Sequence, residues 1–537
     1  MTGAAPSRAG TPRLKLPAPA APDPLPATRR ARRPATADAL SERATQALIR
    51  RTLCPQQSRE VQPPIHDVLP PLTSRNDVDL ELYAFLAIIL RHFVQSWYGA
   101  ITPDESFVAE IVHIVAHCSR ALEQRLRKLD LGSLVFDELP EVLDQHVAAY
   151  RAAHAPVARP PLAVDPHEAY HSLWPLPPLS PVPSPGDATA AAEQRENEVA
   201  YRQLLVQAVL AVLLPTEDLE NPCLTALVGQ IFSELIIGDV LVNKAAQPWL
   251  IFEGICILAR SLEEDKKAAA APDHQPPRPG APVTRGRMHS IQGLLWSTVS
   301  LAFTVLSSIC LLVQSLATSS SLPSRATRGR DMERKRTLSP GPPQPAQVPV
   351  LDFAAWRCAG NFIELGSRMP WLGGFLSLLQ FGAVHGPGRV ARLDGTLDRL
   401  LSHRINTLFS PVRLSAALRT VRGVVFPNNA PGSSSLCPPS SDAELRALRR
   451  RAASALWGLM PSGVARVYFG AGSPWRRRAG AADEGTVVDE VEGLLMVLGD
   501  EYCNKHLVYG LLELLLVKLM PELSEKGVVE LWDERLG

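Results

Sequence analysis

The chain has 537 residues, of which 46% are apolar and 20% are charged, and its formal net charge is +1 at pH 7. This balance excludes the strongly basic field by which proteins attract nucleic acid, so we expect no nucleic-acid partner. The length allows two to four domains. The eight cysteines are scattered without a CxxC pair, a pattern that argues against a disulfide framework or a zinc ribbon and favours reduced thiols.

The first 71 residues are rich in alanine, proline and arginine, with a tight basic cluster at Arg29, Arg30, Arg32 and Arg33. A mitochondrial presequence shares this Arg-rich, acid-poor composition, but the many prolines oppose the amphipathic helix that it needs. We therefore predict that residues 1–71 form a disordered basic arm.

Residues 76–264 carry helical apolar spacing and no alternating strand pattern, which predicts an all-α fold. Helices are expected to start at Asn76–Asp77, at Thr102–Pro103 and after Asn221, where short polar side chains and prolines favour a first turn. Residues 154–190 are too proline-dense for regular structure, and we expect a loop there.

The middle of the chain contains a segment, residues 288–324, without any Asp, Glu, Lys or Arg. It is long enough to span a bilayer, to lie in one leaflet, or to pack as a core helix against protein or a bound acyl chain, and its composition leaves these three alternatives open. Linkers at 265–287 and 325–349 flank it, the second one basic and proline-rich. The candidate membrane contacts are Leu295, Trp296, Phe303, Leu306 and Leu311, with Arg325, Arg328 and Arg330 as candidate headgroup ligands.

Residues 351–537 return to helical periodicity. The stretch 507–520 is apolar on nearly every side, with only Glu513 and Lys518 charged, and is expected to be deeply buried. A basic cluster, Arg476 to Arg478 beside Trp475, is more typical of a solvated loop than of a headgroup site.

Catalytic and metal signals are weak. His113 and His117 have a zinc-compatible spacing, but the glutamate of an HExxH motif and a third ligand are missing. Three carboxylates, Glu234, Asp239 and Glu253, are expected on helix surfaces rather than as a buried acid–base pair. The sequence contains no GxSxG or P-loop motif, so we expect a non-enzymatic protein without cofactor or metal.

Two sets of residues resemble a known family. Asn221, Pro222, Pro248 and Trp249, with their apolar neighbours, resemble the PXA domain of the sorting nexins and their fungal relatives. Residues 351–537 resemble the sorting-nexin C-terminal (nexin C) domain, and the matching residues are Asn504, Lys505, Tyr509, Pro521, Glu522 and Leu523. The chain is therefore similar to short fungal members that lack a PX domain.

The resemblance implies that the two regions fold together around an apolar groove, that the matching residues have structural roles, and that the protein binds or transfers lipid. Two co-folded halves must lie on one side of a membrane, which disfavours a single clean pass by residues 288–324. The expected partners are membrane lipids, through their acyl chains and anionic headgroups, and sorting proteins. Phosphatidylinositol binding is also expected, although the lack of a PX domain argues against direct phosphoinositide recognition by a PX pocket. The expected location is the cytosolic face of the endoplasmic reticulum or of an endosome or vacuole. The alternative is a scaffold that recruits sorting partners and carries no lipid.

Overall fold

The computed structural model describes residues 40–54, 63–102, 106–155, 164–184, 186–270, 314, 322, 347–430, 436–460, 468–469 and 484–537. Within these ranges the chain is helical and contains no strand, which confirms the all-α prediction. Outside them lie the acid-poor stretch up to residue 39, nearly all of the charge-free segment and the Arg476 cluster. The proposed membrane contacts therefore lie outside the described residues, namely Leu295, Trp296, Phe303, Leu306, Leu311, Arg325, Arg328 and Arg330.

The N-terminal half consists of helices that precede the charge-free segment. They are α2 (Glu42–Leu53), α3 (Ile65–Val68), α4 (Asn76–Ile89), η1 (Leu90–Val94), α5 (Gln95–Ile101), α6 (Ser106–Leu126), α7 (Leu131–Ser133), η2 (Leu134–Glu138), α8 (Leu139–Ala153), α9 (Pro166–Leu173), η3 (Pro177–Leu179), α10 (Ala188–Leu213), α11 (Thr216–Leu219), α12 (Pro222–Gln230), η4 (Ile231–Lys244) and α13 (Pro248–Ala270). The π-helical segment η4 continues α12 without a break.

The C-terminal half begins after the second linker. Its helices are η6 (Val350–Asp352), α16 (Ala354–Phe362), α17 (Leu365–Arg368), α18 (Pro370–His385), α19 (Thr396–Leu408), α20 (Pro411–Val425), η7 (Pro427–Asn429), α21 (Asp442–Leu459), α23 (Glu484–Leu494), η8 (Leu495–Leu498), α24 (Glu501–Leu519), α25 (Glu522–Glu525) and α26 (Val528–Leu536).

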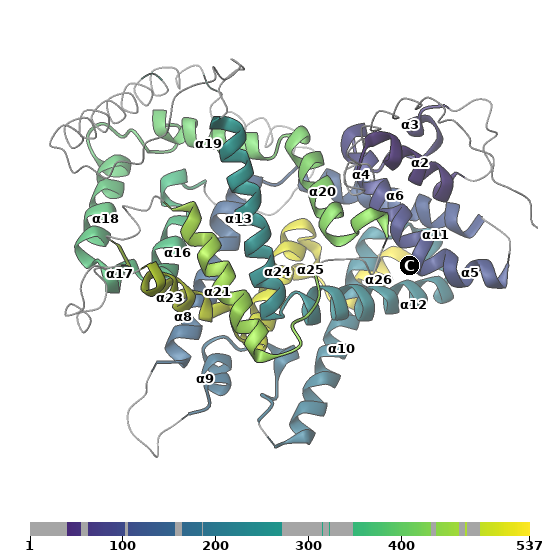
Figure 1. The fold of residues 1–537 in the computed structure, drawn as a ribbon. Helices are drawn as coiled ribbons and strands as arrows, with labels where there is room; N and C mark the ends of the chain where they lie inside the picture. The colour runs from purple at the N-terminus through teal and green to yellow at the C-terminus, as the bar shows by residue number, and fades with distance from the viewer. Residues whose placement is uncertain are drawn as a thin grey trace, which may run out of the picture.

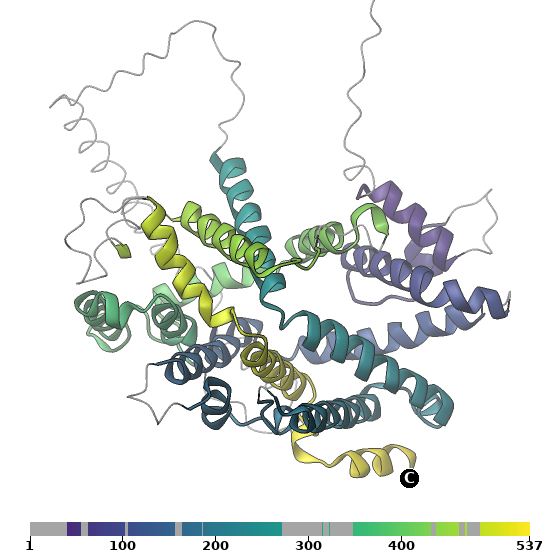
Figure 2. The same ribbon diagram turned by 60° about the horizontal axis from the view of Figure 1, so that its bottom comes forward.

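The two halves interleave rather than forming separate domains. In Figures 1 and 2 the yellow helices α24 and α25 lie in the middle of the molecule, among blue and teal helices of the N-terminal half. Helix α13 packs on α21, α8 on α16 and α24, α4 on α20, and α10 on α26. One apolar cluster joins Phe252 of α13 to Ala452 of α21 and Val487 of α23. Each half thus buries apolar surface that would otherwise face water.

Order begins earlier than expected at the N-terminus, because part of the stretch assigned to a disordered arm is helical. Ser41 caps α2 by accepting a hydrogen bond from Ala44 N, and Leu48 and Ile49 are buried against α4. The cap and the apolar spacing were visible in the sequence, but the proline-rich residues before them dominated the composition.

The proline-rich stretch 154–190 also contains more order than expected. Helix α9 and the 3-10 turn η3 lie within it, and Tyr170 and Leu179 are fully buried. Asp165 caps α9 and Pro166 occupies its first turn. The prolines therefore start short helices and then end them, instead of preventing local structure altogether.

Helix α24 is less evenly buried than its sequence suggests. Its first half holds the buried residues, among them Asn504 and His506, whereas the leucine-rich second half is only partly buried and Val517 is exposed. The expectation of deep burial for 507–520 is therefore wrong for most of that stretch, because neighbouring helices cover the second half of α24 only in part.

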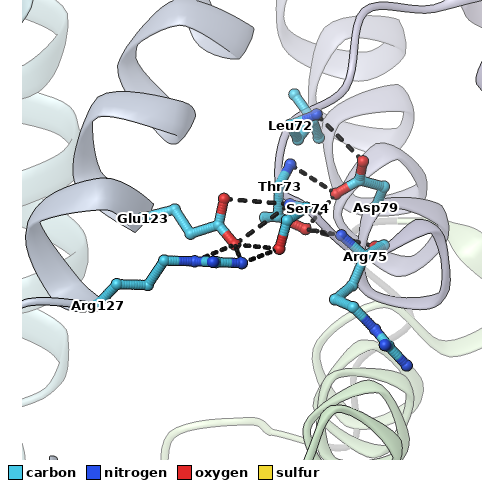
Figure 3. A network of polar contacts seen from close by, with 7 residues as sticks. All are labelled: Leu72, Thr73, Ser74, Arg75, Asp79, Glu123 and Arg127. Atoms are coloured by element: carbon cyan, nitrogen blue, oxygen red, sulfur yellow. Dashed lines mark hydrogen bonds and ion pairs between the residues drawn. The ribbon is translucent and has the colours of Figure 1, made fainter. Parts of the chain in front are cut away.

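The loop before α4 is fixed by two carboxylates from different helices (Figure 3). Asp79 of α4 accepts hydrogen bonds from Leu72 N at 3.2 Å and Thr73 N at 2.7 Å. Glu123 of α6 accepts from Ser74 N at 3.1 Å and from Ser74 Oγ at 2.7 Å. The helix begins at Asn76 as predicted, but Asp79, not Asn76, satisfies the loop amides that precede it.

Candidate lipid-binding groove

The signature residues of the second half meet those of the first. Asn504 is fully buried, and its amide donates to the carbonyl oxygens of Ala246 and Leu498, each at 3.0 Å. Ala246 lies in the turn just before Pro248, which is buried, and Trp249, which is half-buried. Asn504 thus holds the turn between η4 and α13 in place.

Lys505 and Tyr509 contact a buried ion pair on α10. Glu198 and Arg202, one turn apart, are both buried and lie 3.1 Å from each other. Lys505 Nζ lies 3.2 Å from Glu198, and Arg202 donates to the Tyr509 hydroxyl at 3.2 Å. A buried charge that loses its partner is costly, so these contacts define one register of α24 on α10.

The end of the chain is attached to the N-terminal half by α25. Arg125 of α6 lies 2.9 Å from Glu522, and Leu523 packs beside Ala208 and Ala211 of α10. Burial raises the pKa of Glu522, but the hydrogen bond and charge of Arg125 outweigh it and lower the pKa overall. This contact brings the last helix, α26, onto α10.

The remaining signature residues start helices. The Asn221 side chain accepts hydrogen bonds from Cys223 N and Leu224 N, both at 3.2 Å, and Pro222 stands in the first turn of α12. Pro521 immediately precedes α25. These positions direct α12 along α10, where it forms one wall of a groove.

The groove lies between α10, α12 and α26 and consists of two adjoining hollows that share Gln207, Thr225 and Ala226. The larger has a volume of about 440 Å³ and is lined by Gln207, Leu210, Pro222, Thr225, Ala226, Val528, Val529 and Trp532. The smaller has a volume of about 280 Å³ and is lined by Gln203, Gln207, Thr225, Ala226, Gly229, Gln230 and Ser233. We call the two together the α10–α26 groove. Their volumes fall near the range of small-molecule sites.

The chemistry of the groove changes along its length. The α26 end is mainly apolar, and Trp532 is held there by a hydrogen bond from its Nε1 to the Gln207 carbonyl oxygen at 3.2 Å. The other end offers amide and hydroxyl groups from Gln203, Gln230 and Ser233. None of the lining residues is charged. The groove is therefore suited to a molecule with an apolar chain and an uncharged polar part.

The outer surface of the groove wall is apolar as well. Leu227, Ile231, Phe232 and Leu235 of α12 and η4 are all exposed. Within the described residues, Pro222–Lys244 is also the one helix whose length and mean hydropathy of 1.6 would suit a membrane span, with 22% of its apolar window buried. Since it packs along α10, we interpret it as the wall of the groove.

A second polar cluster lies where α8, α9 and α24 meet. His146 Nδ1 lies 2.8 Å from the Tyr170 hydroxyl, and its Nε2 donates to the Val497 carbonyl oxygen at 3.1 Å. His506 Nε2 lies 3.2 Å from His171 Nδ1. Burial lowers the pKa of His146 and of His506 to about 4, so both imidazoles are neutral at pH 7.

The reactive group nearest these histidines is poorly suited to catalysis. Cys503 is fully buried, and burial together with the charge of Asp500 raises the pKa of its thiol. Burial alone would raise the pKa of Asp500, but hydrogen bonds from His167 and from Cys503 N hold it at about 2. We read the cluster as a packing contact between the halves.

The other candidate residues lie apart from the groove. His113 and His117 are exposed on α6, and the described residues contain no group of three His, Cys, Asp or Glu that could hold a metal. Glu234 and Asp239 are exposed on η4. Glu253 pairs with Arg260 and Arg451 on the surface. These carboxylates share no buried site.

Sequence reasoning did not identify the groove residues Gln207, Val528 and Trp532. A signal existed, because α26 places Val528 and Trp532 one turn apart and α12 offers the small residues Ala226 and Gly229. Nothing in the sequence showed that α26 would lie across α10, more than 300 residues earlier.

Comparison with known proteins agrees with the first half of this description. Residues 75–258 match the PXA domain family, so this part of the chain is a PXA domain. The chain is 27% identical over 184 residues to PXA domain protein 1 of Schizosaccharomyces pombe, a match that covers 34% of each protein. It is 21% identical over 164 residues to sorting nexin-14 of Danio rerio, covering 30% of this chain and 16% of that protein.

A third relative is an uncharacterized protein of Saccharomyces cerevisiae, 33% identical over 73 residues, with 13% of this chain and 15% of that protein covered. The chain thus spans about a third or less of the length of the curated relatives that it matches. No solved structure matches the chain. The PXA domain relates the chain to the sorting nexins.

Proposed function

We propose that this protein is a non-enzymatic, membrane-associated protein that binds a lipid acyl chain in the α10–α26 groove. The observation that carries the proposal is the groove itself, which is uncharged, apolar at one end, and built from the PXA domain together with the last helix of the chain. Burial of an acyl chain there is driven by about 0.8 kcal/mol for each methylene removed from water.

The proposed orientation follows from the lining residues. The acyl chain lies against Leu210, Val528 and Trp532, and the ester or headgroup atoms receive hydrogen bonds from Gln203 and Gln230. The groove supplies no cation for a phosphate group. It is thus better suited to a lipid with a neutral polar part, or to one whose phosphate remains in water.

The relationship to sorting nexins supports a place in endosomal or vacuolar trafficking, or at contacts between organelles, on the cytosolic face of the membrane. A second half of nexin C type would fit the way in which Asn504, Lys505 and Tyr509 contact the PXA domain. In this view both halves are needed to complete one lipid site.

The test is a substitution that fills the groove without disturbing the fold. Ala226 borders both hollows and is exposed, so Ala226→Trp adds bulk inside the groove at little cost in stability. The matched control is Cys223→Trp, on the same helix and exposed, but not part of the lining. The measurement is the amount of lipid that co-purifies with the full chain, or that it extracts from vesicles, read by native mass spectrometry.

We expect wild type and Cys223→Trp to carry lipid and Ala226→Trp to lose it. Equal lipid content in all three proteins would show that the groove is not the site. A wild-type protein that neither co-purifies with lipid nor extracts it would overturn the proposal and favour the alternative of a scaffold for sorting partners.

A further inference from the structure

Helix α18 exposes its apolar side chains to solvent, the reverse of an ordinary surface helix. Of its 16 residues, Val384 alone is buried, while its large apolar side chains are exposed to solvent. Trp371 is 70% exposed, Leu378 67% and Phe381 62%, and Phe375, Leu376 and Leu379 are also exposed. Trp371, Phe375 and Leu378 follow one another at helical spacing, so they form one continuous stripe. In Figures 1 and 2 the helix lies at the left edge of the molecule.

The opposite side of α18 packs against the rest of the protein. The Gln380 amide donates to the Leu351 carbonyl oxygen at 2.9 Å, and Gly373 faces Leu365. An ordinary surface helix buries its leucines and exposes its amides. Here the amide faces the protein and the aromatic residues face outward, so the stripe has no apolar partner among the residues that the structure describes.

The chain around this stripe is basic. Residues 386–404, which follow α18 directly, contain four arginines and no lysine, against two aspartates. Asp398 is buried and accepts hydrogen bonds from Val350 N at 2.8 Å and Asp394 N at 3.0 Å, so it does not neutralise the surface. Arg389 and Arg392 are exposed in the turn that follows α18.

That turn places the arginines at one end of the helix. The amide of Ala391 donates to the Ala383 carbonyl oxygen at 3.0 Å, which folds the chain back onto the last turn of α18. Exposed aromatic and leucine side chains beside arginines are the composition of helices that lie in the interface of anionic membranes. Aromatic residues such as Trp371 favour the headgroup level.

A second copy of the chain fits this surface less well. A stable protein–protein interface buries about 800 Å² on each partner, from about 20–30 residues a side. The exposed apolar surface of α18 comes from six side chains on one helix, and its neighbours are cationic, so two copies would bring like charges together. A lipid surface can cover a single helix and at the same time neutralise the arginines.

We propose that α18 is a membrane-docking helix that inserts Trp371, Phe375 and Leu378 into the interface of an anionic bilayer, with Arg389 and Arg392 contacting lipid phosphates. The inference rests on the proposed association with membranes and adds the surface that carries it. It does not depend on the lipid in the α10–α26 groove, which lies on other helices.

The test is sedimentation of the full chain with vesicles of phosphatidylcholine, with or without phosphatidylserine. The triple variant W371S/F375S/L378S removes the stripe, and because these side chains are exposed the fold is retained. The control F93S/I101S/L173S removes three other large exposed apolar side chains, from η1, α5 and α9. Circular dichroism verifies the helix content of both.

We expect the triple variant to bind phosphatidylserine vesicles at least about tenfold more weakly than wild type. The reason is that it lacks the three apolar side chains that the bilayer would partly bury. The control variant binds as wild type does. The variant R389Q/R392Q loses the preference for phosphatidylserine over phosphatidylcholine.

Several outcomes would overturn the inference. One is equal vesicle binding by wild type and the triple variant. The same holds if vesicle binding is lost only in a variant that lacks residues 288–324. Another is a wild-type dimer that the triple variant converts to a monomer without a change in vesicle binding. Lipid retained by wild type in the groove assay, with no vesicle binding, would refute the docking helix and leave the groove proposal standing.

Discussion

Arg422 and Glu81 form an ion pair at 3.0 Å although 341 residues separate them in the chain. Their side chains are 0% and 1% exposed, so the pair is sealed inside the contact between α20 and α4. The guanidinium also donates to Thr45 of α2 and to Asn429, each at 2.9 Å. Helix α20 and the two N-terminal helices α2 and α4 therefore depend on one charge.

The substitution Glu81→Gln should be among the most damaging single changes at this contact. It leaves Arg422 buried without its counter-charge, and the loss of one partner of a buried pair costs about 3–5 kcal/mol. The control is Arg419→Gln, because Arg419 lies 2.8 Å from the same carboxylate but is 46% exposed, so its loss should cost about 0–1 kcal/mol. Urea unfolding of the three proteins measures both values. Similar losses of stability in the two variants would contradict the assignment of Glu81 as the buried counter-charge of Arg422.

Gly510→Ala should destabilise the packing of α24 against α8 and against Trp174 at the end of α9. A Cβ at this position would lie 2.6 Å from Trp174 Cζ2 and 3.3 Å from Val142 Cγ1, so the indole must move. Overpacking of this kind costs about 1–3 kcal/mol. Tryptophan fluorescence of the folded protein should change, and the added substitution Trp174→Leu should restore part of the lost stability.

The matched glycine for this experiment is Gly254. It lies within α13, and no atom lies within 4 Å of a Cβ placed there. Gly254→Ala should therefore stabilise the protein by up to about 1 kcal/mol, since alanine is the better helix former. Destabilisation by both substitutions would show that the packing around Gly510 is not the cause of the lower stability of Gly510→Ala.

Stability should fall on mild acidification because of His146 and His506. Burial lowers the pKa of both to about 4 in the folded state, below the ordinary value of 6.5. Between these values the unfolded chain binds protons that the folded protein does not, so each histidine costs about 1.4 kcal/mol per pH unit as the pH falls.

His167 opposes this trend. The hydrogen bond to Asp500 raises the pKa of His167, so its contribution is full at low pH and is lost as the pH rises through that raised value. The test compares urea unfolding of wild type and His506→Gln at about pH 7 and about pH 5.5, above the range in which most carboxylates titrate. The variant should lose less stability on acidification than wild type; an unchanged pH dependence would refute the assignment to His506.

Local structure could be predicted where short-range rules apply. The start of α4 at Asn76 and the start of α12 after Asn221 occur where these local signals placed them. The resemblance to PXA domains was also visible in Asn221, Pro222 and Trp249, since these residues lie at the starts of α12 and α13. The same rules were overlooked at Ser41, where a capped helix follows a proline-rich stretch.

Contacts between the two halves could not be predicted from local sequence patterns. Periodicity shows which positions of a helix are apolar, but not which surface they meet. Helix α18 demonstrates the difference, since its stretch was correctly expected to be helical, yet its leucines and aromatic residues face outward. The second half of α24 is similar, with an apolar sequence that its neighbours cover only in part.

By itself the sequence determined that the described part of the protein is all-α, where helices such as α4 and α12 begin, and that residues 76–264 resemble a PXA domain, because these properties depend on neighbouring residues and shared local motifs. Only the tertiary structure decided that the last helix completes a groove on α10, that Arg422 is neutralised by Glu81, and that α18 presents its apolar side to solvent. These features depend on pairs of segments hundreds of residues apart. Their energies arise from burial and from charge pairing, which exist only once the two halves are packed together.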